Sequence, residues 1–341
     1  MEKNVFIGID FSKLTLDVTF FNVKSFQEKH YEQFGNDRSG CVKMFKWIKK
    51  RYPDTSLWLF CGEFTGIYTL TLALFLRDKK IDLWLENPMQ IKLSNGINRV
   101  KNDKVDSMQI ANYAYRFQDK MKLYKPQSDA SMEIKELVRF KDRLTKVKVQ
   151  LQVPAAEIKR VMKGCDVANS ILNSTKELVA GIEGQIKDVE RRIHFLLKKD
   201  ADMDRLYTLV TSVVGVGMQT AIYLLVHTSA FTSFSNVRQL ACYCGVAPFA
   251  KSSGTSIRGK NQVSHIANKK LKSLLHMCAL NAVRYDPVLK AYYQRKINEG
   301  KHKMNVLNSV RNKLLQRIWA VVQSGEIYDQ TYHQNKAAIA A

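Results

Sequence analysis

The stretch VFIGIDFSKLTLDVTFFN (residues 5–22) decides the fold of the N-terminal part of the chain. Its two halves, VFIGID (5–10) and LTLDVTFFN (14–22), are rich in β-branched and aromatic residues and are separated by the short segment FSK. Two such runs joined by a few residues predict a β-hairpin. The hairpin places a carboxylate, Asp10, at the end of an apolar strand.

The residues that follow alternate between helical and strand patterns up to about residue 125. YEQF (31–34) predicts a third short strand, and Pro53 ends a helical pattern that begins at Ser39. Two more apolar runs of strand length and two more helical patterns come next, at 56–64, 82–88, 65–80 and 103–117. This order predicts an α/β domain whose sheet contains both antiparallel and parallel strands.

Residues 129–200 have a different pattern, in which apolar residues recur at steps of three and four between Lys and Arg. One series begins at Leu137 and a second at Leu178. The spacing predicts two long amphipathic helices that run as an antiparallel pair or a coiled coil. Pro154 argues against one unbroken first helix, because proline removes a backbone hydrogen bond. We interpret this segment as a spacer or a dimerisation arm.

Residues 204–330 are predicted to form a second globular unit, which is mostly helical. An apolar helix ends at Gly215-Val216-Gly217 and another begins, as in a helix-hairpin-helix segment. Such glycines let backbone N–H groups approach a phosphate, but simple close packing of two helices explains them equally well. The chain is thus predicted to have four parts: an α/β domain (1–125), a helical spacer (126–203), a C-terminal domain (204–330) and a tail (331–341).

The charge of the chain indicates a polyanionic partner. There are 54 Lys and Arg against 31 Asp and Glu, a net charge of +23, and residues 251–317 hold fifteen of these cations against two acids. Nucleic acid is the usual partner for such an excess. The chain has no run of 18 apolar residues and no signal-peptide pattern, so we expect a soluble, cytoplasmic protein without membrane contact. Its six scattered cysteines are expected to be buried thiols, because they lack zinc spacing.

Four carboxylates of the α/β domain fall where they can meet. Asp10 and Glu63 each end an apolar strand, and Asp103 and Asp106 lie on one face of the first turn of a predicted helix. A carboxylate is costly in apolar surroundings unless it is paired or binds a cation, and Mg²⁺ accepts such oxygens. Two ions about 3.5–4 Å apart would stabilise a phosphodiester displacement.

Each of these acids also has a structural interpretation. Asp103 could cap its helix, and Asp106 could interact with the helix dipole. Asp10 could close the turn between the first two strands, and Glu63 could pair with a lysine. The joint arrangement of the four favours a metal site.

A basic segment rich in serine and glycine occupies residues 248–272. Ser252, Ser253, Gly254, Arg258 and Lys260 suit a loop that holds a phosphate. A serine becomes a nucleophile only when a base or a metal activates it, and no local base is evident. Composition alone therefore predicts a phosphate-binding loop without chemistry, and the nearby histidines are interpreted as core or surface residues, namely His227, His265 and His276.

Longer motifs make the chain resemble the DEDD transposases of the insertion-sequence 110 family, which includes the Piv and MooV invertases. They are GIDFSK (8–13), GEFTGIY (62–68) and NPMQIKLSNGINRVKNDKVDSMQIANYA (87–114), and the resemblance continues through 209–221 and 231–272. It implies a RuvC-like (RNase H-like) domain that binds Mg²⁺, with two ions per site and Mn²⁺ as a substitute. The implied ligands are Asp10, Glu63, Asp103 and Asp106.

The same resemblance assigns chemistry to the basic segment. In the family a serine of the C-terminal domain attacks DNA and forms a covalent phosphoserine intermediate; here it matches Ser253, with Ser252 as a one-residue alternative. Ser264 also matches the family pattern, whereas Ala267-Asn268 stands where Gly-Asn is usual. The residues expected to contact nucleic acid are Lys251, Ser252, Gly254, Arg258, Lys260, Lys269, Lys270, Lys272, Gly215 and Gly217.

The resemblance also implies partners: donor and target DNA, a structured bridge RNA that pairs with both, and assembly into a dimer or tetramer. The expected function is RNA-guided DNA recombination by an insertion-sequence transposase that acts at the nucleoid. Two alternatives stay open. A metal-dependent junction endonuclease would hydrolyse DNA without a covalent intermediate, and a non-catalytic nucleic-acid scaffold would need none of the four acids.

Overall fold

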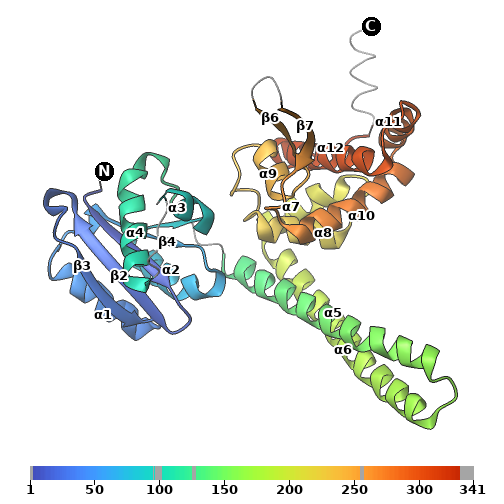
Figure 1. Cartoon of the computed structure of the whole chain (residues 1–341), viewed down its shortest axis with the longest axis horizontal. Coiled ribbons are helices and arrows are strands. Elements are labelled where there is room, and N and C mark those ends of the chain that lie inside the picture. Colours follow the sequence, from blue (N-terminus) through green and yellow to red (C-terminus); the bar gives the residue numbers. More distant parts are fainter. Residues whose placement is uncertain (1–2, 95, 97–101, 125–127, 254–256, 331–341) are drawn as a thin grey trace, which may run out of the picture. The chain divides into compact units, whose positions relative to one another are not determined.

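The structure is a computed structural model that describes residues 3–94, 96, 102–124, 128–253 and 257–330, except for the side chains of 250–261. The chain forms two compact units, Met1–Pro126 and Gln127–Ala341 (Figure 1). The helices and strands of the first unit are β1 (Val5–Phe11), β2 (Thr15–Asn22), β3 (His30–Gly35), α1 (Arg38–Lys49), β4 (Trp58–Glu63), α2 (Leu70–Asp78), β5 (Asp82–Glu86), α3 (Pro88–Ser94) and α4 (Asp103–Arg116).

The first unit contains a five-stranded sheet in the order β3-β2-β1-β4-β5. β1 and β2 form the predicted hairpin and β3 pairs antiparallel with β2, whereas β4 and β5 run parallel to β1. The mixed sheet expected from the sequence is therefore confirmed. Ser12 closes the hairpin turn, because its Oγ accepts a hydrogen bond from the backbone N–H of Thr15 (2.9 Å).

Alternation along the strands gives the sheet two apolar faces. On one face Ile7 and Ile9 of β1 pack with α1 and α2, and on the other face Phe6 packs with α3 and α4. Gly8 belongs to the second face, because successive side chains point to opposite sides. A Cβ at position 8 would lie 2.1 Å from the carbonyl oxygen of Ser107 in α4. Glycine at this position therefore lets α4 lie directly on β1.

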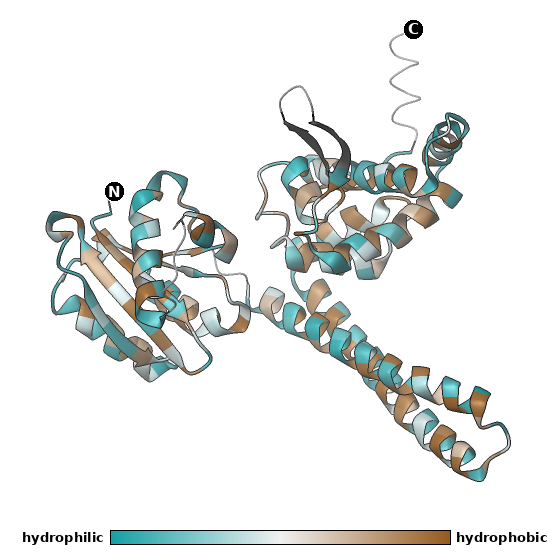
Figure 2. Cartoon of the chain, in the orientation of Figure 1, coloured by the Kyte–Doolittle hydropathy of each residue, from teal (hydrophilic) through white to brown (hydrophobic). Residues whose placement is uncertain are grey.

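The second unit begins with two long helices. Its elements are α5 (Asp129–Val161), α6 (Asp166–Lys199), α7 (Ala201–Ser212), α8 (Met218–His227), α9 (Val237–Tyr243), β6 (Pro248–Ser253), β7 (Ile257–Val263), α10 (Lys269–Tyr285), α11 (Pro287–Asn298) and α12 (Lys303–Ser324). Hydrophobic and hydrophilic residues alternate along both long helices (Figure 2). α5 and α6 run antiparallel, and ion pairs join them, such as Lys141–Glu190 (2.7 Å) and Lys148–Glu183 (3.2 Å).

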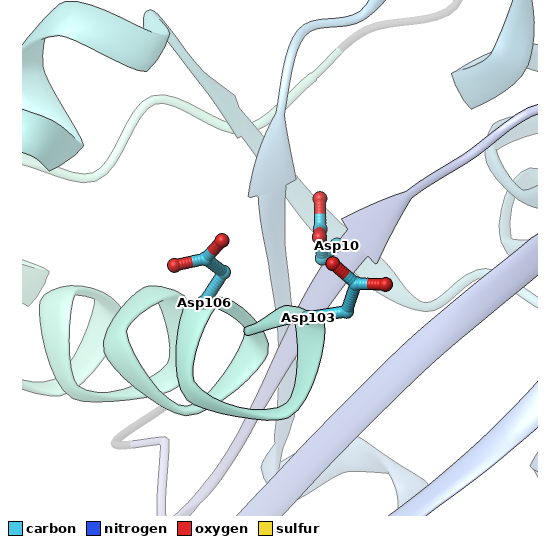
Figure 3. Close-up of side chains that lie close together, drawn as sticks. All are labelled: Asp10, Asp103 and Asp106. Atoms are coloured by element: carbon cyan, nitrogen blue, oxygen red, sulfur yellow. The ribbon is translucent and has the colours of Figure 1, made fainter. Parts of the chain in front are cut away.

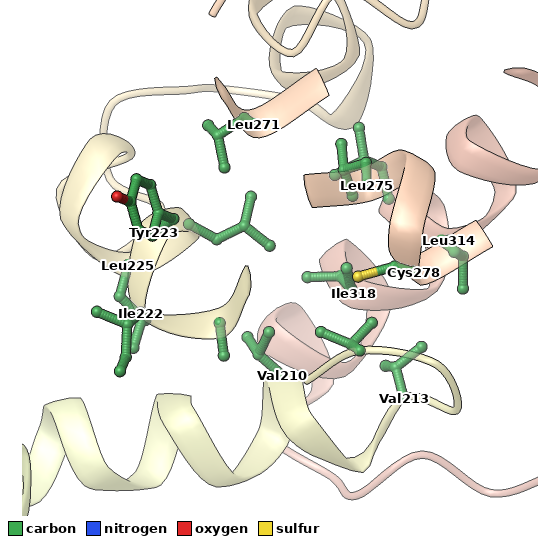
Figure 4. Packing of buried hydrophobic residues seen from close by; sticks show 14 of the residues in the cluster. Val210, Val213, Ile222, Tyr223, Leu225, Leu271, Leu275, Cys278, Leu314 and Ile318 are labelled. Atoms are coloured by element: carbon green, nitrogen blue, oxygen red, sulfur yellow. The ribbon is translucent and has the colours of Figure 1, made fainter. Parts of the chain in front are cut away.

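Helix α5 continues through Pro154, so the break that we expected there is wrong. Proline costs one backbone hydrogen bond, but Ala155 beside it is buried, and α5 packs along α6. At the other end of the pair, Val138 of α5 and Ile193 of α6 join the hydrophobic core of the later helices. Figure 4 shows part of that core, in which Leu275 of α10 and Leu314 of α12 lie among residues of α7 and α8.

The four-part division of the chain stays a prediction.

One local feature of this unit differs from a simple helical bundle. The basic segment begins as an antiparallel hairpin, β6–β7, in which Ser252 pairs with Arg258. Ile, Val and Phe within it favour strands over the expected loop. None of the described helices has the length and hydropathy that a membrane span requires. The predicted tail (331–341) lies outside the described residues.

Candidate functional site

Three carboxylates from two elements meet on the α4 face of the sheet (Figure 3). Asp10 comes from β1, and Asp103 and Asp106 come from the first turn of α4. Each offers an oxygen, and these oxygens all lie within 4.8 Å of one another. Asp10 and Asp106 are partly buried, whereas Asp103 is exposed. Such a group of hard oxygen donors suits a divalent cation.

Two hydrogen bonds exclude structural interpretations of these acids. Asn102 caps α4, because its Oδ1 accepts a hydrogen bond from the backbone N–H of Lys104 (2.9 Å). Asp103 is therefore not the helix cap. Similarly, Ser12 rather than Asp10 closes the turn of the β1–β2 hairpin. The carboxylates of Asp10 and Asp103 are therefore best explained as members of the group of three acids.

Glu63 ends β4 at the same edge of the sheet. Ile9 pairs with Gly62 in the parallel β1–β4 ladder, so the next residues, Asp10 and Glu63, are neighbours. Cys61 of β4 packs on the α4 face, and alternation places Glu63 on that face as well. The group of three does not include Glu63, but its charge acts on Asp10.

The surroundings of Asp10 disfavour its charged form. The pKa of Asp10 is raised from 3.8 to about 6. Burial is the largest cause, and the nearby carboxylates of Asp106, Asp103, Glu63 and Asp17 account for the rest of the shift. Because like charges and burial act in the same direction, a bound cation would offset both. The electrostatics of the site therefore favour a cation.

Two acids of this face were missed by the sequence analysis. Asp17 of β2 pairs directly with Asp10 and is buried; its carboxylate accepts hydrogen bonds from Tyr31 Oη (2.7 Å) and Gln33 Nε2 (3.1 Å). Glu86 of β5 pairs with Glu63 and accepts a hydrogen bond from the backbone N–H of Asn87 (2.7 Å). The signal for Asp17 was the presence of an acid within the apolar run 14–22. Asp17 lies opposite Asp10 in the hairpin, so both side chains point to the same face of the sheet.

The predicted serine site is described only in its backbone. Ser253 is the last residue of β6 and pairs with Ile257. The side chains of Lys251, Ser252, Ser253, Arg258 and Lys260 lie outside the described residues, as does the whole of Gly254.

The remaining predicted nucleic-acid contacts differ from one another. Lys269 is exposed at the start of α10, and Lys270 forms an ion pair with Asp142 of α5 (3.1 Å). Asn268 caps α10, because its Oδ1 accepts a hydrogen bond from Leu271 N–H (3.0 Å). The Asn268 backbone N–H donates to the carbonyl of Tyr243 (2.8 Å). These two hydrogen bonds of Asn268 fix the turn next to Ala267, the residue that departs from the family pattern.

The glycine pair between α7 and α8 has two different environments. Gly215 has φ +91°, and a Cβ there would lie 2.8 Å from the carbonyl oxygen of Cys278 in α10. Gly217 faces open space and precedes α8. Close helix packing therefore explains Gly215, while Gly217 leaves its backbone accessible.

Comparisons with known proteins agree with the order of these features. An IS110-type DEDD transposase model matches residues 7–156, and the model of the "Transposase IS116/IS110/IS902 family" matches residues 207–294. The pilin gene-inverting proteins of Moraxella lacunata and Moraxella bovis are each 25% identical over 337 residues, which covers 97% of this chain and 100% of theirs. An IS110 insertion-element protein of Streptomyces coelicolor is 30% identical over 169 residues, covering 50% of this chain and 40% of its own.

Proposed function

The chain belongs to the IS116/IS110/IS902 family of insertion-sequence transposases, which act on DNA, and from that premise we propose a Mg²⁺-dependent recombinase that works through a serine–DNA intermediate. The observation that carries the proposal is the meeting of Asp10, Asp103 and Asp106 on the face of a mixed sheet. A scaffold would gain nothing from such a group, because it raises the electrostatic energy of the fold.

The first part of the proposal concerns the metal. Asp10, Asp103 and Asp106, joined by Glu63, would hold one or two Mg²⁺ ions, and Mn²⁺ would substitute, because both prefer carboxylate oxygens. When bound, the ions would polarise the scissile phosphate. The strand order β3-β2-β1-β4-β5, with acids on β1, β4 and α4, supports a RuvC-like (RNase H-like) assignment for this unit.

The second part concerns the serine. The Oγ of Ser253 would form a bond to the phosphorus of the scissile phosphodiester, while the bond from phosphorus to one sugar oxygen breaks. The proton that Ser253 loses balances the one that the released sugar hydroxyl gains. A second DNA hydroxyl then reverses these steps and restores Ser253. Lys251, Arg258 and Lys260 of the same hairpin would hold the phosphate.

The third part concerns partners. A structured guide RNA would select donor and target DNA by base pairing, and the basic C-terminal region has the charge to bind it. Assembly as a dimer or tetramer is supported by apolar side chains that stay exposed toward the far end of the helix pair. They include Val153 (51% exposed), Val161 (75%), Val167 (61%) and Leu178 (58%).

The test begins with the nucleic acid that co-purifies with the protein, which is sequenced to obtain the RNA and its DNA sites. Incubation with RNA, donor and target should give a protein–DNA adduct that survives denaturing electrophoresis. Ser253→Ala should remove the adduct, whereas Ser252→Ala should keep it. An adduct that survives both changes would overturn the serine assignment. Cleaved DNA without any adduct from the unchanged protein would favour the junction endonuclease instead.

The acids are tested in the same reaction. Asp10→Asn should slow adduct formation at least about 100-fold, because removal of one ligand weakens the metal site. Asp78→Asn is the matched control, since Asp78 is an exposed acid of the same unit, at the end of α2. Equal rates for the two variants would revive the non-catalytic scaffold.

A further inference from the structure

Arg311 of α12 is a buried cation that has no counter-charge among the described residues. Its side chain is only 7% exposed, and its Nε has no hydrogen-bond partner. Arg311 makes no hydrogen bond or ion pair with any residue that the structure describes. The undescribed side chains of this unit, in 250–261 and 331–341, include no Asp or Glu. No described anion therefore compensates this guanidinium, and an anion from outside the chain would offset the cost of burying it.

A second arginine of α12, Arg317, does have an internal partner. Arg317, six residues further along α12, forms an ion pair with the buried carboxylate of Asp286 (2.6 Å). That carboxylate also accepts a hydrogen bond from the backbone N–H of Leu289 and so begins α11 (2.8 Å). Arg317 thus has an internal partner, which Arg311 lacks.

Two basic residues of α10 lie on the side of the helix where His276 interacts with Arg311. His276 of α10 has a buried Nδ1 without a hydrogen-bond partner. Burial lowers the pKa of His276, and the charge of Arg311 lowers it further. Lys272, one turn earlier on the same face of α10, lies against Gly245: a Cβ at position 245 would be 3.9 Å from Lys272 Nζ. Positive and donor groups of α10 and α12 therefore gather on one region.

This region adjoins the start of the β6–β7 hairpin. Asn308, one turn before Arg311 on α12, donates a hydrogen bond from Nδ2 to the carbonyl of Val246 (2.9 Å). β6 begins two residues later, at Pro248. The unpaired guanidinium is thus tied through α12 to the base of the segment that carries the candidate nucleophile.

We propose that Arg311, with His276 and Lys272, forms a binding site for a phosphodiester group of a nucleic-acid backbone. A guanidinium presents a planar fork of N–H donors that matches two phosphate oxygens. The site rests on the proposed function in one respect, since that function makes nucleic acid the anion at hand. It adds a contact on the helices, apart from the hairpin, through which the C-terminal unit holds DNA or RNA.

The test measures binding rather than recombination. A fluorescently labelled DNA duplex and a labelled RNA hairpin are titrated with full-length protein over a range of salt concentrations. Arg311→Met should weaken binding about tenfold at moderate salt and reduce the slope of log K against log salt by about one. Lys303→Met is the matched control, because it removes one exposed charge at the start of the same helix, and it should change affinity less than threefold. Arg311→Lys should fall between the two.

Each outcome decides the proposal. Weakened binding of one probe alone supports the site and shows whether its phosphate comes from DNA or from RNA. Weakened binding of both probes supports a site that binds the phosphate common to DNA and RNA. Unchanged binding of both probes by Arg311→Met overturns the site. If the Ser253-dependent adduct still forms in that variant, the proposed function stands without it.

A second measurement covers the case in which the methionine variant fails to fold. Inorganic phosphate should raise the thermal unfolding midpoint of the unchanged protein and of Lys303→Met by the same amount, and should raise that of Arg311→Lys and His276→Gln by less. Equal shifts in all four proteins would show that Arg311 and His276 bind no phosphate, and would overturn the proposal.

Discussion

The carboxylate group of the N-terminal unit and the basic group of the C-terminal unit are opposites in charge and in burial. Asp10, Asp103 and Asp106 come together at a partly open face, where like charges raise the pKa of Asp10 to about 6. Arg311 and His276 interact where α10 and α12 pack together, and burial is the main cause that lowers both pKa values. The first arrangement suits a small cation that solvent can deliver. The second suits an anion such as a phosphate, whose oxygens accept hydrogen bonds from the guanidinium.

The ion pair Arg317–Asp286 shows what an internally paired arginine contributes, for comparison with Arg311. The largest effect on stability is expected at this pair. Asp286→Ala should lower the free energy of unfolding by about 3–5 kcal/mol, because it leaves the largely buried Arg317 unpaired and removes the cap of α11. Arg311→Met should change that free energy by less than about 1 kcal/mol, because no hydrogen bond or ion pair with a described residue is lost and methionine keeps much of the apolar packing. Urea unfolding followed by circular dichroism measures both. A loss for Arg311→Met as large as that for Asp286→Ala would make Arg311 structural and break the comparison.

The next effect concerns how the acidic group is assembled. Gly8→Ala should destabilise the N-terminal unit by about 1–3 kcal/mol, because the added methyl group collides with the backbone of α4 at Ser107 and Ala111. The same shift of α4 would carry Asp103 and Asp106 away from Asp10 and lower metal affinity. Unfolding curves with and without Mn²⁺ measure the two consequences separately.

Gly181→Ala in α6 is the control for this change. Nothing lies within 4 Å of a Cβ at position 181, so alanine there should stabilise the helix by about 0.5–1 kcal/mol. If Gly8→Ala behaved like Gly181→Ala and kept its metal response, the close contact of α4 with β1 would not be what assembles the site.

The sequence predicted the acidic group better than the basic one, and the reason is the range of the contacts. Asp10 follows from strand alternation, and Asp103 and Asp106 follow from helical spacing, so each position is set by local pattern. Asp17 carried a local signal too, in the middle of an apolar run, but its importance depends on pairing with Asp10 across the hairpin. Glu63 followed from the same strand-end pattern as Asp10, and the motif resemblance supplied the interpretation of the four acids as metal ligands.

Arg311 carried no comparable signal. In the sequence it is one of fifteen cations in a basic segment, and its burial depends on how α10 and α12 pack together. Local rules also failed at Pro154, where packing with α6 keeps the helix continuous. They failed again at 248–263, where a hairpin replaces the expected loop. In each case contacts distant in sequence decide the outcome.

The smallest effect, and the one that separates the two groups most cleanly, is the dependence of stability on pH in the absence of metal. The folded-state pKa of Asp10, about 6, is above its ordinary value of 3.8, so the folded protein binds more protons than the unfolded chain between these values. Stability should therefore fall as pH rises through that window, and the loss should be complete above about pH 6. After allowance for solvent screening at this partly exposed group, the loss is of the order of 1 kcal/mol.

Asp10→Asn removes the titrating group, so its unfolding midpoint in EDTA should vary less between pH 4.5 and 7.5 and should exceed that of the unchanged protein at pH 7. Asp78→Asn should keep the original dependence. Arg311→Met should keep it as well, because arginine stays protonated across this range. Adding Mn²⁺ should reverse the trend for the unchanged protein above pH 6, since metal binding requires the deprotonated carboxylates. Parallel curves for Asp10→Asn and Asp78→Asn would mean that the pKa of Asp10 is not raised in the folded protein, and the contrast between a cation site and an anion site would lose its electrostatic basis.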